Sequence, residues 1–555
     1  MGTYLHPGKD AYEEAVNSKI FIDKTEMIPF LNSVIKTKQK YVSVSRPRRF
    51  GKTMAADMIC AYYDREADSR SLFEKRKLAG CNPLINGNKE LSWDAYLGKF
   101  DVIRLVMTDF LEGSDNVQDV IDYLTDEITE DLRDAYPEVD SGKRKNLRTL
   151  MNKIYGKTKR QFVIIIDEWD ALFRVWKEDT EGQTKYLDFL RDWLKDKTYI
   201  ALAYMTGILP IKKYGEHSAL NMFTEYSMIT PRQLAPYTGF TEEEVQDLCE
   251  EYHMDYGEIS NWYDGYVISD QIPPDEREAY RKGEYLGHKI SIYSPLSVVE
   301  SMTTGRIQNY WNKTETYIAL AEYIRKDYDG LKDAVALLMD GGRLRIDTST
   351  YQNDMTTFHS RDDVLSLLIH LGYLGYDDET SEVFIPNNEI LDEFKTSTKD
   401  SEWVDTFEQF RLSQEVLKAT WDEKSNRVAE LLESAHNKAS NKTYNDEAAL
   451  SYAIQLAFYA AQKYYTPIPE FDSGKGYADI VYLPSPKYPD KPVLLVELKY
   501  EKDVDSALAQ IKRQEYPDRL IHYRGNILLV SINYDKDARN DDPNFKHHMC
   551  SIDRA

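Results

Sequence analysis

An apolar strand followed by Gly-Lys-Thr constrains this chain more than any other stretch. Residues 41–44 (Tyr-Val-Ser-Val) predict a buried strand, and residues 54–59 predict the helix after the loop. A phosphate-binding loop requires this strand-loop-helix order, because the loop amides and the helix N-terminus together face the phosphates. The sequence therefore predicts an ATP-binding loop. Its residues are Arg46, Pro47, Arg48, Arg49, Phe50, Gly51, Lys52 and Thr53.

Each end of this loop predicts something different. At its C-terminal end, Lys52 is expected to reach the β and γ phosphates, and Thr53 to hold Mg²⁺. At its start, the usual pattern has glycine where this chain has Arg46, followed by Pro47. The loop must therefore close without the φ freedom of that glycine. This favours nucleotide binding over fast hydrolysis.

A second apolar strand ends in two carboxylates. Residues 162–166 (Phe-Val-Ile-Ile-Ile) are followed by Asp167 and Glu168. Asp167 is expected to bind Mg²⁺ directly or through water, and Glu168 to polarise the attacking water, because phosphoryl transfer depends on positioning and charge neutralisation. Alone, the pattern would also suit a buried strand that stops at a solvated acidic turn. Together with the loop, it predicts an NTPase.

Three motifs can be compared with known families, namely residues 21–25 (Phe-Ile-Asp-Lys-Thr), 46–53 and 206–210 (Thr-Gly-Ile-Leu-Pro). They resemble the bacterial AAA-ATPase-like family, whose members usually carry a C-terminal PD-(D/E)xK nuclease-like domain. Residues 262–266 (Trp-Tyr-Asp-Gly-Tyr) and 293–297 (Tyr-Ser-Pro-Leu-Ser) also resemble its middle segment, although Asn is expected before the proline of the latter. The resemblance spans most of the chain. It implies that the loop without its first glycine is a family trait.

The residues of the C-terminal region predict a hairpin independently of the family resemblance. Residues 476–482 and 492–499 form two expected strands around a proline-rich turn. Because side chains alternate along a strand, Glu497 and Lys499 share a face while Leu498 points to the other. Asp479 can sit opposite them.

This hairpin predicts a metal-dependent nuclease site. The carboxylates of Asp479 and Glu497 and the carbonyl of Leu498 form an all-oxygen ligand set that suits Mg²⁺ or Mn²⁺. Lys499 would then orient or activate the water that attacks phosphorus. Glu-x-Lys is also common on solvated strands, so the spacing alone favours that simpler interpretation.

Further residues strengthen the nuclease interpretation. Glu447 lies on an expected helix over 446–461, and the resemblance implies another acidic residue of the nuclease core there. The resemblance also implies that Gln510, on the helix after the Glu-x-Lys strand, belongs to the site. Glu470 is either a further ligand or a turn residue. Residues 525–532 predict another buried strand.

Length and charge bound the architecture. A chain of 555 residues is too long for one core. We expect an α/β protein with a P-loop AAA-ATPase-like domain with a parallel sheet over 1–235, a helical middle region over 236–404 and a restriction-endonuclease-like α/β domain over 405–555. The net charge of −24 argues against nucleic-acid binding by bulk attraction. A nuclease would need a local basic surface, for which the candidates are Lys499, Lys502, Lys512, Arg513, Arg519 and Arg524.

The middle region gives weaker signals. Residues 241–245 predict a capped helix start. A helix near 365–369 followed by a hairpin through 372–374 and 383–386 resembles a winged helix, which would either bind DNA or pack the ATPase against the nuclease. Its acidic turn over 377–379 favours packing. Arginine-finger candidates are identified only by position, and they are Lys212, Lys213 and Arg232.

Composition and residue spacing restrict which metal sites and which cellular compartment we expect. The four cysteines lack CxxC or His-paired spacing, which argues against a zinc site or a disulfide framework. His547 and His548 are better explained by a polar tail than by metal binding. No apolar run reaches the roughly 20 residues that span a bilayer, and no signal pattern begins the chain. We therefore expect a cytoplasmic protein without a membrane partner.

Two classes of function follow. In the first, an ATP-binding module with slow turnover controls a Mg²⁺-dependent nuclease, with Mn²⁺ as an alternative ion and DNA favoured over RNA as the partner. In the second, the chain is a nucleotide-switched scaffold of the STAND type whose C-terminal domain binds nucleic acid or protein without cutting. A homo-oligomer is expected if a neighbour supplies the arginine finger.

Overall fold

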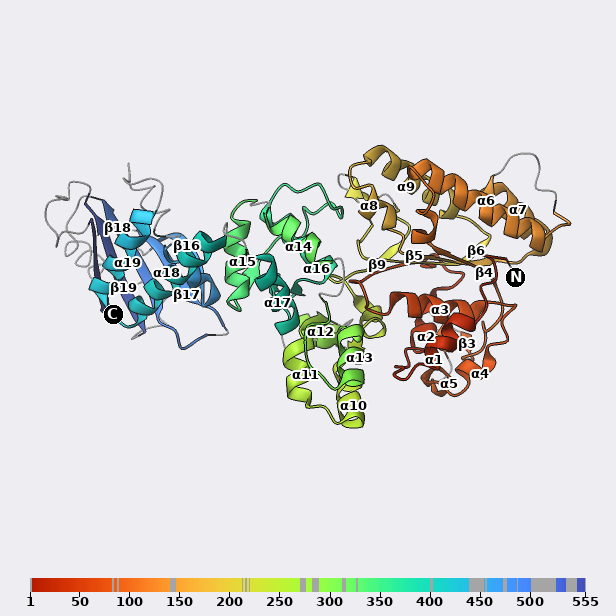
Figure 1. Cartoon of the computed structure of the whole chain (residues 1–555), viewed down its shortest axis with the longest axis horizontal. Helices are drawn as coiled ribbons and strands as arrows, with labels where there is room; N and C mark the ends of the chain where they lie inside the picture. Colours follow the sequence, from red (N-terminus) through yellow and green to blue (C-terminus); the bar gives the residue numbers. More distant parts are fainter. Residues whose placement is uncertain are drawn as a thin grey trace. The chain divides into compact units, whose positions relative to one another are not determined.

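The computed structural model of this protein divides into two compact units (Figure 1). The first comprises residues 1–323 and 345–394, and the second 324–344 and 395–555. The predicted domain boundaries after 235 and 404 stay a prediction. The structure describes residues 2–554 except 82–83, 87–88, 140–145, 212, 215–216, 219, 270–275, 282–288, 312–315, 326–327, 400–402, 439–453, 455–456, 473–476, 487, 501–525 and 536–546.

A five-stranded parallel sheet forms the centre of the first unit, in the order β4-β5-β6-β1-β9. Its strands are β1 (Tyr41–Ser45), β4 (Asp101–Val106), β5 (Phe162–Asp167), β6 (Ile200–Gly207) and β9 (Thr224–Tyr226). Every residue of β1, β5 and β6 is buried, which is why these strands are near-continuous apolar runs in the sequence. The strands predicted over 41–44 and 162–166 are confirmed.

Helices cover both faces of this sheet (Figure 1). One layer contains α1 (Asp10–Val16), α2 (Met27–Val34), α3 (Lys52–Tyr63), α4 (Arg70–Phe73) and α5 (Lys77–Gly80). The other contains α6 (Val117–Ala135), α7 (Leu147–Thr158) and α9 (Thr180–Leu194). α6 begins where Asn116 accepts hydrogen bonds from the amides of Gln118 and Asp119, which satisfies two helix N–H groups. This sheet and its two helix layers form a three-layer α/β fold.

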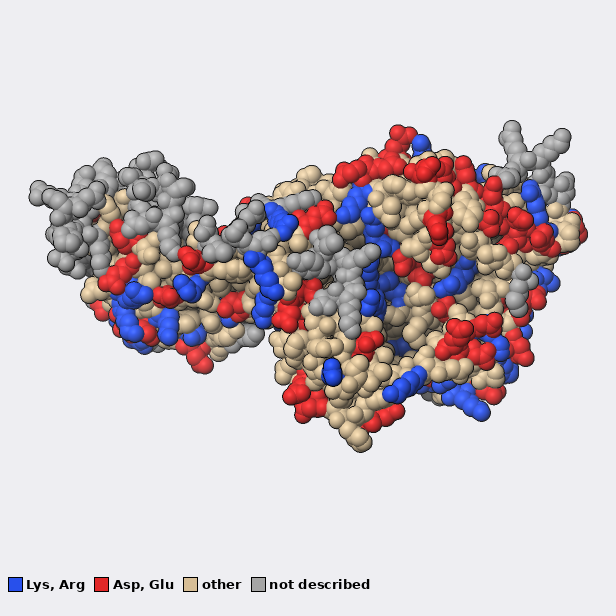
Figure 2. Space-filling model, in the orientation of Figure 1, with Lys and Arg blue, Asp and Glu red and all other residues tan. Residues whose placement is uncertain are grey.

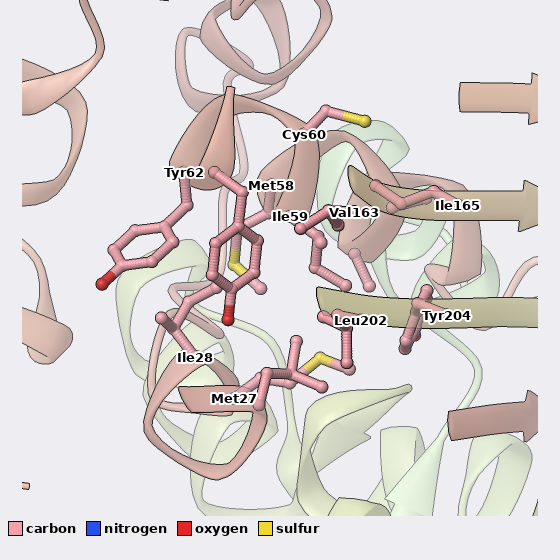
Figure 3. Close-up of a cluster of buried hydrophobic side chains, with 14 of the residues drawn as sticks. Met27, Ile28, Met58, Ile59, Cys60, Tyr62, Val163, Ile165, Leu202 and Tyr204 are labelled. Carbon is pink, nitrogen blue, oxygen red and sulfur yellow. The ribbon is translucent and has the colours of Figure 1, made fainter. Parts of the chain in front are cut away.

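The core between α3 and the sheet fixes the strand and helix that flank the phosphate loop. Figure 3 shows Met58 and Ile59 of α3 beside Val163, Ile165 and Leu202 of the sheet. All of these side chains are at most 2 % exposed. Burial on this scale stabilises by roughly 1.5–3 kcal/mol per large apolar side chain. The loop is therefore anchored at both ends by rigid elements.

A smaller antiparallel sheet, β10-β12-β11, follows with three helices around it. These elements are β10 (Phe240–Thr241), α10 (Glu242–Tyr252), α11 (Tyr256–Tyr263), β11 (Tyr266–Ser269), β12 (Lys289–Tyr293) and α13 (Pro295–Thr304). Thr241 and Glu244 form a capping box at the start of α10. The predicted capped helix start is confirmed.

The predicted helix and hairpin of the winged-helix pattern are present in the first unit as α16 (Arg361–Leu371), β14 (Gly375–Asp377) and β15 (Glu382–Phe384). The acidic turn of this hairpin is held by Lys289, which lies 3.1 Å from Asp377 and 2.8 Å from Glu379. Ser269 also donates to Asp378 at 2.5 Å. The hairpin therefore packs on β11 and β12 of its own unit.

A mixed five-stranded sheet forms the second unit, in the order β16-β17-β18-β19-β20. Its strands are β16 (Tyr465–Asp472), β17 (Tyr477–Pro484), β18 (Val493–Tyr500), β19 (Ile527–Tyr534) and β20 (His548–Arg554). β17 and β18 are antiparallel and β18 and β19 are parallel. The predicted hairpin and the strand near 525–532 are confirmed.

Alternation along these strands separates two cores. Leu494, Val496 and Leu498 pack with α18 (Val404–Trp421) and α19 (Ser425–Lys438), whereas Val493 and Leu495 belong to a cluster on the opposite face. Because side chains alternate along a strand, Glu497 lies on the same face of the sheet as Val493 and Leu495. Leu498 thus lies on the face opposite Glu497, as predicted.

The remaining elements are short or connect these parts. They are β2 (Leu84–Asn86), β3 (Lys89–Leu91), η1 (Met107–Phe110), α8 (Ala171–Val175), β7 (Lys213–Tyr214), β8 (His217–Ser218), η2 (Arg232–Tyr237), α12 (Arg277–Arg281), α14 (Thr316–Arg325), α15 (Leu331–Met339), β13 (Leu344–Arg345), α17 (Asn388–Ser397) and η5 (Tyr459–Lys463).

Candidate nucleotide and metal sites

The phosphate loop closes around the ammonium of Lys52. Its Nζ donates to the carbonyls of Arg46 at 2.9 Å and Pro47 at 2.6 Å. Gly51 precedes α3 with a φ of +77°, a conformation that glycine adopts without strain. Burial lowers the pKa of Lys52 to about 8. The loop thus holds a buried cation at the start of a helix.

Arg46 explains how this loop forms without its first glycine. Its Nη1 donates to the carbonyls of Ser45 and Tyr226, each at 2.9 Å, so the side chain ties the end of β1 to β9. The side chain is fully buried, and burial lowers its pKa to about 10. Neither Arg46 nor Pro47 lines the adjoining cavity. Arg46 therefore supports the loop without lining the cavity.

Phe50 joins the loop to the middle sheet. Its ring packs edge-on against Tyr266 of β11 with 5.4 Å between centroids, and its carbonyl accepts from the amide of Gly239 at 3.0 Å. The Tyr266 hydroxyl in turn donates to the Gly372 carbonyl at 2.5 Å, just after α16. The 262–266 motif thus supports the phosphate loop from a distant part of the sequence.

A cavity of about 930 Å³ lies over the loop and has two kinds of wall. The polar wall contains Arg48, Arg49, Gly51, Lys52, Thr53, Glu168, Thr108, Lys24 and Arg174. The apolar wall contains Ile20, Phe21, Ile22, Phe240, Pro295, Leu296 and Val299. A volume of this size, apolar with a few convergent polar groups, suits a small organic ligand. The motifs at 21–25 and 293–297 therefore help to build the apolar half.

Sequence reasoning missed several of these residues as site residues, because their signals are not contiguous with the loop. Lys24 donates to the Pro236 carbonyl at 2.7 Å and to Glu244 at 2.5 Å, which ties the 21–25 segment to the start of α10. Thr108 and Arg174 come from η1 and α8. Arg232, one of the three arginine-finger candidates identified by position, does not line the cavity, and the side chains of Lys212 and Lys213 lie outside the described residues.

Asp167 lies at the C-terminal end of β5 and is 1 % exposed. One of its oxygens accepts from the Thr206 hydroxyl, so the 206–210 motif fixes this carboxylate. The other, Oδ2, has no hydrogen-bond partner among the described residues and lies 3.9 Å from Nη2 of Arg104. A buried carboxylate oxygen without a hydrogen bond fits a magnesium ion or its water.

Glu168 lines the cavity and is held by an ion pair. Its Oε2 lies 2.6 Å from Nη2 of Arg174, and its backbone has a φ of +51°, in the left-handed region. Arg174 also lies 3.6 Å from Asp170, which is fully buried. The Asp170 carboxylate accepts hydrogen bonds from the backbone amides of Ile208 and Leu209. Asp167 is thus fixed by Thr206 of β6, and Glu168 by Arg174 of α8.

In the second unit, one sheet face changes from apolar to polar along its strands. Glu497 of β18 is 5 % exposed and aligns with Ser531 of β19, while Lys499 aligns with Asn533. Ser531 is fully buried, and its hydroxyl lacks a hydrogen-bond partner within the described ranges. An unsatisfied hydroxyl beside a buried carboxylate fits a metal with bound water.

Several predicted nuclease residues lie outside the described residues. Glu447, Gln510 and the basic candidates from Lys502 to Arg524 are among them, as are the side chains of Glu470, Asp479 and Lys499. The backbones of Asp479 and Lys499 lie in β17 and β18. Among the side chains that are described, no three His, Cys, Asp or Glu residues gather as a metal site.

Charge is unevenly distributed on the surface. Figure 2 shows Asp and Glu side chains gathered over α6 and α9 of the first unit. This face would repel a phosphate backbone. His548 of β20, considered in the sequence as part of a polar tail, is buried and lies 2.8 Å from Glu433 of α19. Across the described part of the chain, no helix is long and apolar enough to cross a membrane.

Comparison with known proteins gives two family matches. Residues 8–215 match a family described as predicted AAA-ATPase, and residues 447–542 match the PD-(D/E)XK nuclease superfamily. No curated protein matches the chain. One solved structure that it resembles is the ORC2 protein of Aeropyrum pernix in its ADPNP and ADP complexes, with 12% identity, coverage of 70% of this chain and 98% of that chain, and a TM-score of 0.28. A likeness at that TM-score carries no argument about fold or function.

Proposed function

We propose that this chain, which carries an AAA-ATPase-like domain followed by a domain of the PD-(D/E)XK nuclease superfamily, binds ATP in its first unit and cleaves nucleic-acid phosphodiesters in its second. The observation that carries the first part is the two-walled cavity over Lys52. The second part is supported by the buried Glu497 at the polar end of an otherwise apolar sheet face.

The cavity walls suit the two ends of a nucleotide. Lys52, Arg48 and Arg49 supply cations for phosphates, and the start of α3 supplies backbone amides and a positive dipole end. The apolar wall around Phe240 and Leu296 suits the base. Binding exchanges the bonds of Lys52 to the loop carbonyls for bonds to phosphate oxygens, which are stronger because both partners are charged.

Hydrolysis would use the two carboxylates after β5. Thr53 and Asp167 would hold Mg²⁺, which when bound neutralises phosphate charge. Glu168 would accept a proton from water as the water oxygen bonds to the γ-phosphorus and the bond from that phosphorus to the β–γ bridging oxygen breaks. In this structure Glu168 is paired with Arg174 at 2.6 Å. Glu168 must leave this pair before it can accept the proton, and this additional step is expected to slow turnover.

The second unit would hydrolyse phosphodiesters with Asp479, Glu497 and Lys499. Asp479, Glu497 and the Leu498 carbonyl would hold Mg²⁺ or Mn²⁺, which stabilises developing negative charge when bound. Lys499 would orient the attacking water. The water oxygen bonds to phosphorus, one ester oxygen leaves with the electron pair of its broken bond, and the proton of the water is released to solvent or a base.

A second candidate function is a nucleotide switch without cleavage. The Glu168–Arg174 pair favours it for the first unit, because a carboxylate bonded to a guanidinium must leave that partner before it can bind the attacking water. In that case the second unit would bind nucleic acid or protein. Steady-state ATP turnover well below about 1 s⁻¹ is expected for a switch.

The test is cleavage of plasmid DNA, linear single-stranded DNA and RNA with Mg²⁺ or Mn²⁺, with and without ATP. We expect the wild type to cut DNA, and Lys499→Ala to lower the rate at least about 100-fold while ATP affinity stays unchanged. Lys52→Ala should instead weaken ATP binding. Lys424→Ala is a matched control, because this lysine of the second unit is 61% exposed and forms an ion pair with nearby Asp422.

Each half of the proposal can fail separately. If Lys52→Ala left ATP affinity intact, the phosphate-loop assignment would be wrong. If the wild type cut no substrate under any condition while binding ATP, the nucleotide-switched binding protein would replace the nuclease. Cleavage that survives Lys499→Ala would place the reaction at another site or in a contaminant.

A further inference from the structure

Arg174 is a cavity residue that neither the motifs nor the proposed mechanism assigns to a ligand. It lies in the short helix α8, a few residues after β5, which ends at Asp167 and is followed directly by Glu168. Its side chain is 14% exposed, and it lines the same cavity as Lys52 and Thr53. Its position therefore gives it access to whatever Lys52 binds.

The guanidinium has one fixed partner and one exchangeable partner. The fixed partner is Asp170, whose carboxylate forms an ion pair with Nε at 3.6 Å, beyond hydrogen-bond distance, and is itself held by the backbone amides of Ile208 and Leu209. The exchangeable partner is Glu168, which bonds Nη2 at 2.6 Å and has a side chain that is 36% exposed. Arg174 can thus change its Nη2 partner while Asp170 keeps it in place.

Electrostatics favour such an exchange when a triphosphate enters. The cavity already contains Lys52, Arg48 and Arg49, so a phosphate chain binds in a positive environment. Glu168 follows β5, at the end of the strand where a catalytic carboxylate faces the terminal phosphate. A guanidinium bonded to that carboxylate therefore lies on the side of the third phosphate, and it forms stronger, bidentate bonds with phosphate than lysine does.

We propose that Arg174 distinguishes ATP from ADP by exchanging its bond to Glu168 for a bond to the γ-phosphate. This rests on the nucleotide site proposed above. With ADP in the cavity, Arg174 stays on Glu168, and the carboxylate remains paired. With ATP, Arg174 bonds the γ-phosphate and Glu168 becomes free to accept a hydrogen bond from water. The third phosphate would thereby create the base that its own hydrolysis needs.

The test compares equilibrium affinities for Mg²⁺-ADP and for Mg²⁺-AMP-PNP, an ATP analogue that is not hydrolysed, on the full chain by calorimetry. We expect the wild type to prefer the analogue by about tenfold or more, because its γ-phosphate gains a charge-assisted bond from Arg174 that ADP does not receive. Arg174→Ala should bring this ratio close to one while leaving ADP affinity within about twofold. Arg174→Lys should restore part of the preference.

Glu168→Gln provides the opposite perturbation. It removes the carboxylate that competes for Arg174, so affinity for AMP-PNP should rise severalfold while ADP affinity stays unchanged. Arg191→Ala is the matched control, because this arginine of α9 is 48% exposed, pairs with Asp188 and does not line the cavity. It should leave both affinities unchanged.

The outcomes separate this inference from the proposal on which it rests. If the wild type bound neither nucleotide, the nucleotide site itself would be wrong. If Lys52→Ala weakened both nucleotides but Arg174→Ala kept the wild-type ratio, or lowered both affinities equally, only the role of Arg174 would be wrong. Should Arg174→Ala fail to fold, an unchanged ratio in Glu168→Gln would contradict the exchange.

Discussion

The two candidate sites differ in how their residues are brought together. In the first unit, the residues from Arg46 to Thr53 are contiguous, and Lys52 makes its bonds within that loop. In the second unit, Asp479 lies on β17, whereas Glu497 and Lys499 lie two residues apart on β18. The distance between them depends on how β17, β18 and β19 pair. A contiguous loop is determined locally, whereas a spaced set is determined by strand register.

The difference extends to the surrounding structure. The phosphate loop is supported from far along the chain, through Phe50 on Tyr266 and through Arg46 on Tyr226. Glu497 instead follows Val493 and Leu495 on one sheet face and relies on burial and alternation. A change in a remote support should therefore affect the first site most, and a change of neighbouring strand residues the second.

The largest expected effect tests the remote support. Gly265 precedes β11 with a φ of +116°, and a Cβ there would lie 2.0 Å from the Pro386 carbonyl oxygen. Gly265→Ala should destabilise the first unit by about 3 kcal/mol, through strain and displacement of β11. Differential scanning calorimetry should show the transition of the first unit moving to lower temperature while that of the second unit stays.

Gly305→Ala is the control for backbone strain alone. Gly305 has a φ of +65° but open space around its Cβ direction, so the cost should be about 1 kcal/mol. Equal losses for the two variants would show that contact with Pro386 does not support β11. Movement of both transitions by Gly265→Ala would mean that the units do not unfold independently.

An intermediate effect is expected at the second site. Ser531→Ala removes a buried, unsatisfied hydroxyl beside Glu497 without adding any atom. We expect the Mg²⁺ concentration for half-maximal cleavage to rise about tenfold, because groups next to metal ligands orient them. Folding stability should not fall, because no described hydrogen bond is lost. Metal titrations of the cleavage rate measure this directly.

Ser551→Ala is the matched control, because Ser551 of β20 pairs with Ser531 and lies one strand further from Glu497. It should leave the metal requirement unchanged. Identical metal dependence in the wild type and Ser531→Ala would argue against a metal near Ser531 and against the site inferred from the strand register.

The smallest expected effect is a pH dependence of the first site. Burial lowers the pKa of Lys52 to about 8, so the free protein loses this ammonium as pH rises through that value. Phosphate binding needs the charged form, so ATP affinity should fall about fourfold between pH 7 and pH 8.5. Calorimetry in buffers of different ionisation enthalpy should show proton uptake on binding at pH 8.5 and little at pH 6.5.

Lys52→Ala should abolish that proton uptake. Binding by the wild type without uptake at pH 8.5 would mean that Lys52 is already charged there, and that burial does not affect its protonation.

Local patterns in the sequence predicted much of both folds. The strand before the phosphate loop, the strand ending at Asp167, the hairpin of β17 and β18 and the capped start of α10 each follow from short-range apolar patterning or capping. The roles of Glu447, Gln510, Asp479 and Lys499 stay predictions, since their side chains lie outside the described residues. The sequence did not predict Arg174 as a site residue, because a single arginine after an acidic pair has no distinctive spacing.

The sequence alone determined the phosphate loop, the two carboxylates after β5 and the alternation of Glu497 with Leu498, because backbone geometry relates residues that are close along the chain. Only the tertiary structure decided that Arg46 supports the loop from behind, that Leu296 helps to form the cavity wall and that Arg174 holds Glu168. These contacts join segments whose distance along the chain carries no information about their separation in space. They depend on packing between separate elements, which no local pattern encodes.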